Sequence, residues 1–209
     1  HIQLNPVYDY ATVDETKLDT NQFNWGYDPK NYNSPEGSYS TDPYNGDVRV
    51  KEFKEMVKTL HDNDISVVMD VVYNHTYSTD YCYNKLVPDY FYRPGSNGSG
   101  CGNDVASERA MVRNFIVDSV AYWAKEYHID GFRFDLVGLI DVQTIKEIRA
   151  ALDEIDPSII IYGEGWSMTT TTTKEGTALS TQTNAVNLGN FGMFNDTIRD
   201  AIKGSGFQT

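Results

Sequence analysis

Three acidic residues and one arginine are the residues of this sequence best placed to do chemistry. Arg133 and Asp135 stand two apart in the apolar run "GFRFDLVG" (131–138), Asp70 ends the run "ISVVMD", and Glu164 follows "SIIIYG". In a strand, residues two apart face the same side, so Arg133 and Asp135 project together. Burial of two charges is costly unless they pair or face a wet cavity. The pattern therefore leaves a structural ion pair and a functional site both open.

Acids gathered in one cleft shift one another's pKa apart, so one can hold a proton while another stays ionised. A neighbouring Arg133 favours the ionised form of Asp135, which makes Asp135 the predicted nucleophile and Glu164 the protonated acid. A retaining glycosidase uses such a pair, with carboxyl groups about 5 to 5.5 Å apart. Clustered acids can instead bind Mg²⁺ or Ca²⁺, although the charge of Arg133 works against a cation.

Alternating strands and helices would position these acids. The sequence predicts strands at 65–75, 131–138 and 158–166, and helices at 47–64, 107–128 and 141–155. Strand–helix–strand units of this kind give a parallel sheet covered by helices. A doubly wound sheet and a (β/α)8 barrel both fit. We favour the α/β TIM barrel, because Asp70, Asp135 and Glu164 each lie at the carboxyl end of a strand, and these ends meet at the top of a barrel.

The remaining segments are predicted to be mostly loops. Within residues 1–10 we expect a strand that ends at Pro6 or shortly after; a polar loop then reaches Asn45, and Asp47 caps the first helix. A loop-rich insertion occupies about 76–105, and the threonine run at 169–173 is expected to be a solvated linker. A weak strand at 187–194 and a helix at 195–204 follow. The whole chain, 1–209, is interpreted as one domain.

Composition excludes some partners. The net charge of −13 argues against nucleic acid and anionic membranes, and no apolar run approaches the ~20 residues of a membrane span. Aromatic residues make up 13% of the chain and could supply flat faces for sugar rings. Cys82 and Cys101 could form a disulfide or remain free. The chain starts inside a strand-like run without an initiator Met, so we expect a piece of a longer protein.

Several motifs resemble those of a known family. "DVVYNH" (70–75), "GFRFDLVG" (131–138) and "YGEGW" (162–166) resemble the first three signature motifs of the α-amylase superfamily of glycoside hydrolases. "FNWGYDP" (23–29) resembles a motif typical of type I pullulanases, which are α-1,6 debranching enzymes. The resemblance covers essentially the whole chain. It implies a partial catalytic TIM barrel made of about the second to sixth βα units.

The resemblance also implies roles for individual residues. Asp135 would be the nucleophile, Glu164 the general acid/base, and Arg133 would orient and ionise Asp135. The remaining positions would bind substrate. Tyr27 would stack on the sugar at the cleavage point, and His75 would form a hydrogen bond with that sugar. Asp70 and Asn74 would brace or line the site, and Trp166 would either form a wall of the substrate groove or pack in the core.

One departure from the family pattern stands out. Its fourth motif, a His-Asp pair from the seventh strand, does not occur in these 209 residues. That Asp stabilises an oxocarbenium-like transition state, so its absence should cost many orders of magnitude in rate. We therefore expect the parent protein to be a debranching enzyme and the chain alone to be inactive.

The resemblance further implies an α-glucan substrate, no nucleic-acid or membrane partner, and a bacterial extracellular or cell-surface location. No cofactor is expected for the chemistry, although a structural Ca²⁺ near Asn74 is conceivable. An isoamylase-type or neopullulanase-type hydrolase, a non-catalytic glucan-binding barrel and a metal-dependent hydrolase remain alternatives.

Overall fold

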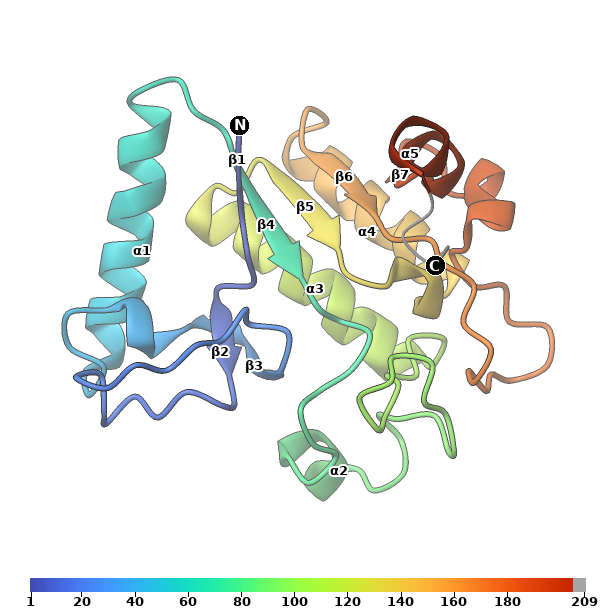
Figure 1. Ribbon diagram of the computed structural model, residues 1–209, viewed down its shortest axis with the longest axis horizontal. Helices are drawn as coiled ribbons and strands as arrows, with labels where there is room; N and C mark the ends of the chain where they lie inside the picture. The colour runs from blue at the N-terminus through green and yellow to red at the C-terminus, as the bar shows by residue number, and fades with distance from the viewer. Residues whose placement is uncertain (205–209) are drawn as a thin grey trace.

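The computed structural model describes residues 1–204 and has a parallel β-sheet at its centre (Figure 1). Its five strands follow one another across the sheet in the order β1-β4-β5-β6-β7. Every pair of neighbours is parallel. The predicted α/β class with a parallel sheet is confirmed. The strands are β1 (Ile2–Leu4), β4 (Val67–Val71), β5 (Gly131–Phe134), β6 (Ile160–Gly163) and β7 (Gly192–Met193).

Helices connect the strands, and α3 and α4 run behind the sheet in Figure 1. A small antiparallel sheet of β2 (Tyr8–Tyr10) and β3 (Pro29–Pro35) lies below β1 in this view. Among residues 1–204, β1 and β7 form the two edges of the main sheet. The helices are α1 (Gly46–His61), α2 (Cys82–Leu86), α3 (Ala110–Tyr127), α4 (Val142–Ile155) and α5 (Asp196–Lys203).

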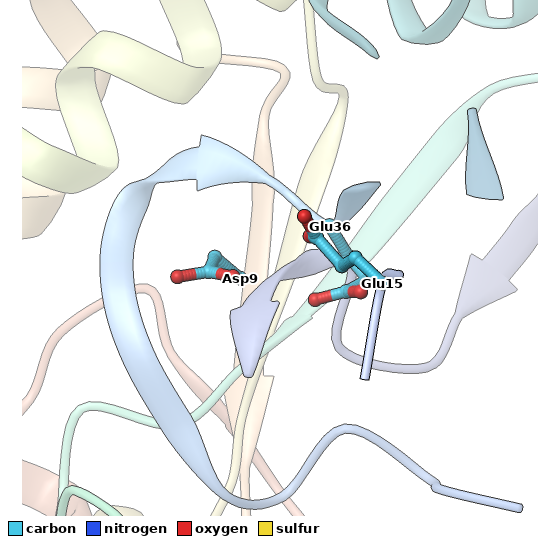
Figure 2. A group of neighbouring side chains, drawn as sticks. All are labelled: Asp9, Glu15 and Glu36. Carbon is cyan, nitrogen blue, oxygen red and sulfur yellow. The ribbon is translucent and has the colours of Figure 1, made fainter. Parts of the chain in front are cut away.

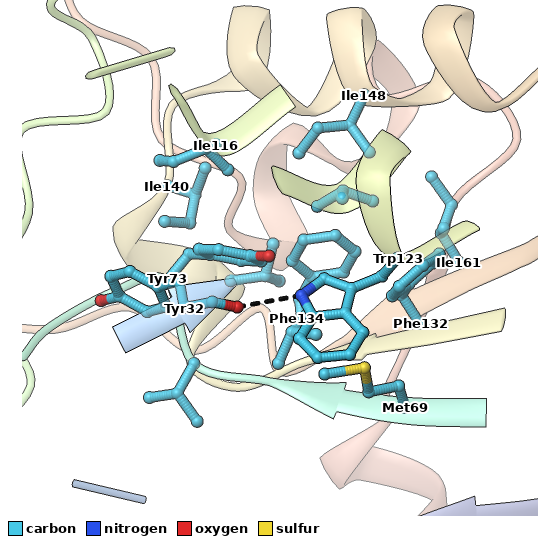
Figure 3. Packing of buried hydrophobic residues seen from close by; sticks show 14 of the residues in the cluster. Tyr32, Met69, Tyr73, Ile116, Trp123, Phe132, Phe134, Ile140, Ile148 and Ile161 are labelled. Carbon is cyan, nitrogen blue, oxygen red and sulfur yellow. Dashed lines mark hydrogen bonds between the residues drawn. The ribbon is translucent and has the colours of Figure 1, made fainter. Parts of the chain in front are cut away.

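Alternate residues of the central strand serve two faces of the sheet. Phe132 and Phe134 of β5 are buried against the helices, and the Trp123 indole of α3 lies beside them (Figure 3). Trp123 Nε1 donates a hydrogen bond of 2.9 Å to the Tyr32 carbonyl, so the buried indole nitrogen keeps a partner. Arg133 between the two phenylalanines faces the other side.

The register of the sheet sets polar residues in a row on that other face. Asp70 of β4 lies opposite Arg133 of β5, and Arg133 lies opposite Tyr162 of β6. Gly131 at the start of β5 allows the close approach of β6, because a Cβ there would lie 2.6 Å from Cγ1 of Ile160. The carboxyl ends of β4, β5 and β6 are thereby held together.

Some predicted elements differ from the structure. Asn45, not Asp47, caps α1, with its side chain accepting from the Asp47 backbone N–H at 3.1 Å. The predicted loop between residues 11 and 45 contains β3, whose proline-rich sequence hides the strand pattern. In the first turn of α3, Met111 is 67% exposed, although its neighbour Val112 is buried.

The C-terminal half brings further corrections. The strand predicted at 187–194 is reduced to the two residues of β7, preceded by the 3-10 helix Gln182–Asn187. The threonine run is not a free linker, since Thr170 and Thr172 bond to the loop at 94–97. Cys82 and Cys101 are both free, exposed thiols. No helix within residues 1–204 combines the length and apolar character needed to cross a membrane.

Candidate active site

The Arg133 guanidinium binds three carboxylates at the carboxyl ends of neighbouring strands. Its Nη1 donates to Asp70 Oδ1 and Oδ2 at 2.9 and 3.0 Å and to Asp135 Oδ1 at 3.2 Å. Its Nη2 lies 2.7 Å from Glu164 Oε1. The structure therefore brings together the four charged residues that the sequence singles out. Arg133 bridges the acids rather than pairing with Asp135 alone.

The three acids differ in their access to solvent. The Asp70 side chain is 1% exposed, whereas those of Asp135 and Glu164 are 13% and 20% exposed. A group that attacks a substrate or gives it a proton must be reachable. Asp135 and Glu164 meet this requirement. Asp70 is buried and holds Arg133 in place through their ion pair.

Asp135 is fixed on its other side by Asn74. The Asn74 Nδ2 group donates to Asp135 Oδ2 at 2.8 Å and to the Asp135 carbonyl at 2.9 Å. Its Oδ1 lies 2.6 Å from Nδ1 of His75, and Nε2 of His75 lies 2.9 Å from the Tyr27 carbonyl. Both ring nitrogens thus face acceptors. Burial lowers the pKa of His75, so the neutral ring has a proton for only one of these bonds.

Tyr27 closes the site from the loop before β3. Its hydroxyl donates to Asp70 Oδ2 at 2.7 Å, and the Arg133 guanidinium lies 6.0 Å from the centre of its ring. Burial, and then the bond to the Asp70 carboxylate, raise the pKa of the Tyr27 hydroxyl above its usual value. This phenol therefore stays a hydrogen-bond donor at neutral pH.

Burial also dominates the electrostatics of Asp70. It raises the pKa of this carboxyl to about 6, although Arg133 and the Tyr27 hydroxyl act in the opposite direction. Burial alone would lower the pKa of Arg133, but the carboxylates of Asp70, Glu164 and Asp135 raise it above its ordinary value. Arg133 is therefore charged at every working pH, while Asp70 changes charge in the mildly acidic range.

The turn after Asp135 positions Glu164. Leu136 has a left-handed backbone (φ 40°, ψ 46°), and its N–H donates to Glu164 Oε2 at 3.3 Å. A left-handed conformation is rare for leucine, and no sequence signal marks it. Phe194 is a second residue that the sequence analysis missed, with its ring centre 5.5 Å from the Arg133 guanidinium. The only signal in the sequence was that Phe194 is aromatic and stands at the end of a predicted strand.

Trp166 lies just beyond Glu164 and is partly exposed. The Arg199 guanidinium lies 5.8 Å from the centre of its ring. A Cβ on Gly138 would lie 2.0 Å from the Trp166 carbonyl oxygen, so the backbone at Trp166 packs tightly against the turn after β5. Trp166 is outside the buried core, which favours the wall of a groove over core packing.

Two groups of side chains are candidates for binding a cation. The Asn74 side chain is bonded to Asp135 through its Nδ2 group, and its oxygen lies 2.6 Å from Nδ1 of His75. Asp9, Glu15 and Glu36 have oxygens within 4.8 Å of one another (Figure 2). Glu15 pairs with Arg49 at 2.7 Å, however, and Glu36 accepts from two backbone N–H groups. These acids are already satisfied by protein donors.

Comparison with known proteins supplies the family. No family model matches the chain. It is 44% identical over 214 residues to the pullulanase of Bacillus subtilis (strain 168), covering 99% of this chain and 29% of that protein. It is 41% identical over 198 residues to the pullulanase of Klebsiella aerogenes, covering 90% of this chain and 18% of that protein.

A solved structure agrees with these matches. The pullulanase of Paenibacillus barengoltzii, in complex with maltohexaose and α-cyclodextrin, superposes with a TM-score of 0.94 at 52% identity. The match covers 98% of this chain and 33% of that one. The chain belongs to the pullulanase family. It spans a third or less of the length of the pullulanases that it matches.

Proposed function

We propose that the protein is a retaining glycoside hydrolase that cleaves α-1,6 branch linkages in pullulan, starch or glycogen. The observation that carries this proposal is the bridging of three strand-end carboxylates by Arg133, with only Asp135 and Glu164 open to solvent. Membership of the pullulanase family supports the choice of linkage. The maltohexaose and α-cyclodextrin bound by the Paenibacillus barengoltzii relative support an α-glucan partner.

The proposed reaction has two steps. Asp135 attacks the anomeric carbon and forms a glycosyl ester, while Glu164 gives its proton to the departing glycosidic oxygen. Glu164 then takes a proton from water, and the resulting hydroxide displaces Asp135 with net retention of configuration. Arg133 and Asn74 hold Asp135 in place for both steps.

The residues around this pair are proposed to bind the sugar at the cleavage point. The Tyr27 ring, fixed through its hydroxyl on Asp70, stacks on that sugar. His75 donates to a sugar hydroxyl when substrate displaces one of its two protein acceptors. Trp166 forms part of the groove wall. We propose that the chemistry needs no metal, because the Arg133 guanidinium already supplies a positive charge to the three acids.

The architecture proposed for this domain is part of a TIM barrel. The strands run β1-β4-β5-β6-β7 without the reversal of order that defines a doubly wound sheet. They would be the second to sixth strands of the barrel. The family's third carboxylate belongs to a motif that the 209 residues do not contain, so we expect this chain alone to lack turnover.

The location proposed is outside the bacterial cell or on its surface, because a branched polysaccharide is too large to enter. An isoamylase-type enzyme would share α-1,6 chemistry, whereas a neopullulanase-type enzyme would cut α-1,4 bonds. "FNWGYDP" (23–29) favours the pullulanase type. A glucan-binding barrel without catalysis would have no need of an exposed acid beside an exposed nucleophile.

Product analysis tests the proposal. Pullulan is incubated with the chain and, in parallel, with the extended protein, which we define as the chain with the flanking sequence that brings it to the length of a whole pullulanase. Maltotriose from the extended protein alone is the expected result. Panose would indicate α-1,4 cleavage instead, and pullulan binding without hydrolysis would leave only a binding role. A chelator tests whether the chemistry needs a metal, and we expect turnover to be unchanged when it is added.

A further inference from the structure

Two loops are joined into one unit, the loop clasp, formed by residues 94–98 and 170–172. Asn97 N–H donates to the Thr170 carbonyl at 3.1 Å, and Thr170 Oγ1 donates back to the Asn97 carbonyl at 2.8 Å. Thr172 N–H donates to Ser96 Oγ at 2.9 Å, and Thr172 Oγ1 donates to the Pro94 carbonyl at 2.9 Å. Segments more than 70 residues apart are thereby hydrogen-bonded along their length.

A buried carboxylate organises the first loop of the clasp. Asp104 is 0% exposed and accepts from the Gly98 and Ser99 N–H groups at 2.7 and 2.9 Å and from the Ser96 hydroxyl. Among residues 1–204, no cation forms a salt bridge with it. Because Ser96 gives its proton to Asp104, its oxygen is left to accept from Thr172. The Ser96 hydroxyl thus connects Asp104 to the second loop of the clasp.

The clasp is packed most tightly at Gly98. A Cβ added to Gly98 would lie 2.1 Å from Oγ1 of Thr171 and 2.6 Å from Cδ2 of Leu139. Leu139 belongs to the turn after β5, the strand that leads into Asp135. The clasp is therefore packed against the same turn that carries the nucleophile.

Both ends of the clasp connect to the active site. The Asn103 side chain binds the N–H and carbonyl of Thr76 at 3.1 and 2.7 Å, and Val105 N–H donates to the Asn74 carbonyl at 2.9 Å. Asp104 lies between these two anchors. On the other side, residues 165–169 link Glu164 to Thr170, so the segment after the acid is held at both its ends.

The geometry points to Asp104 as a positioning residue, which acts through the Ser96 hydroxyl and the Thr172 backbone on the segment that carries Glu164 and Trp166. This inference rests on the proposed function for its kinetic consequence. Asp104 touches no reacting atom; it fixes the segment that follows Glu164. A small displacement of Glu164 from its working position lowers the rate of bond cleavage more than it weakens substrate binding.

The test compares Ser96→Ala with Thr173→Ala in the extended protein. Ser96→Ala removes the relay between Asp104 and Thr172, while Thr173 is an exposed member of the same run without a side-chain hydrogen bond in the described structure. We expect Ser96→Ala to lower kcat on pullulan about tenfold or more, with KM changed about twofold or less. Asp104→Asn, which weakens the same loop, should reproduce this pattern. Thr173→Ala should match the parent.

A second readout does not depend on activity. Gly138 N–H donates to the Glu164 carbonyl at 3.1 Å and lies outside both loops of the clasp. Its hydrogen exchange should be faster in Ser96→Ala than in Thr173→Ala. Equal exchange at Gly138 and equal kcat in these two variants would overturn the inference. If the parent does not cut pullulan at all, the proposed function fails, and the exchange at Gly138 still decides whether the clasp reaches Glu164.

Discussion

The strand ends and the loop clasp hold charged groups in place by different means. At the strand ends, the register of β4 against β5 sets Asp70 beside Arg133, and opposite charges satisfy each other. In the loop clasp, Asp104 is equally buried but is held by neutral hydroxyl and backbone donors. Strong charge pairing fixes the reacting groups, and a network of individually weaker hydrogen bonds fixes the chain around them.

Loss of the nucleophile should have the largest effect. In the extended protein, Asp135→Asn keeps the shape of the side chain but removes the attacking carboxylate, so kcat on pullulan should fall on the order of 10⁴-fold. Binding of pullulan, measured by its retardation of the protein in a gel, should remain. Turnover within about tenfold of the parent would show that Asp135 is not the nucleophile.

Replacement of the bridging guanidinium should come next. Lysine cannot contact three carboxylates at once, so Arg133→Lys should lower kcat about 100-fold and reduce the thermal midpoint. Arg133→Ala should cost about 3 to 5 kcal/mol in the free energy of unfolding, because it leaves buried Asp70 without its partner. The exposed ion pair of Lys58 and Asp62 provides the control, since Lys58→Ala should be near neutral. Equal midpoints for Arg133→Ala and Lys58→Ala would contradict this ranking.

The raised pKa of Asp70 predicts a pH effect on stability. Its value in the folded chain, about 6, exceeds the ordinary 3.8, so the folded state binds more protons than the unfolded state between these values. The stabilising contribution is complete below about pH 4 and is lost as the pH rises through about 6. Between pH 4 and pH 7, chemical denaturation should show that the parent loses about 3 kcal/mol in the free energy of unfolding. Asp70→Asn, which cannot titrate at this position, should not show this loss. Parallel pH profiles of the two proteins would refute it.

The smallest effect is expected away from both regions, at the start of α1. Asn45→Ala removes the side chain that caps the helix and should cost about 1 kcal/mol in the free energy of unfolding, without a change in kcat. Asp47→Ala, at the position that the sequence predicted as the cap, should cost less. If a denaturant titration showed a larger loss of stability for Asp47→Ala than for Asn45→Ala, the Asn45 cap would not be the main stabilising contact at this end of α1.

The comparison of the two regions also explains what the sequence could predict. The proximity of Asp135, Arg133 and Glu164 could be predicted, because parallel strands bring their carboxyl ends together and position along the chain then determines position in space. The role of Asp104 was missed and the threonine run was predicted as a linker, because their pairing depends on loop conformation, which has no periodicity. The strand β3 was missed because its two terminal prolines mimic a loop, and the left-handed Leu136 has a side chain typical of regular structure.

The most direct test of the central claim is to trap the covalent intermediate. Glu164→Gln in the extended protein removes the acid, and a glucosyl donor with a fluoride leaving group, which needs no acid, allows only the first step. Mass spectrometry of the digested protein should find one glucosyl unit on the peptide that contains Asp135. A glucosyl adduct on another residue, or release of the inverted product without any adduct, would contradict the account.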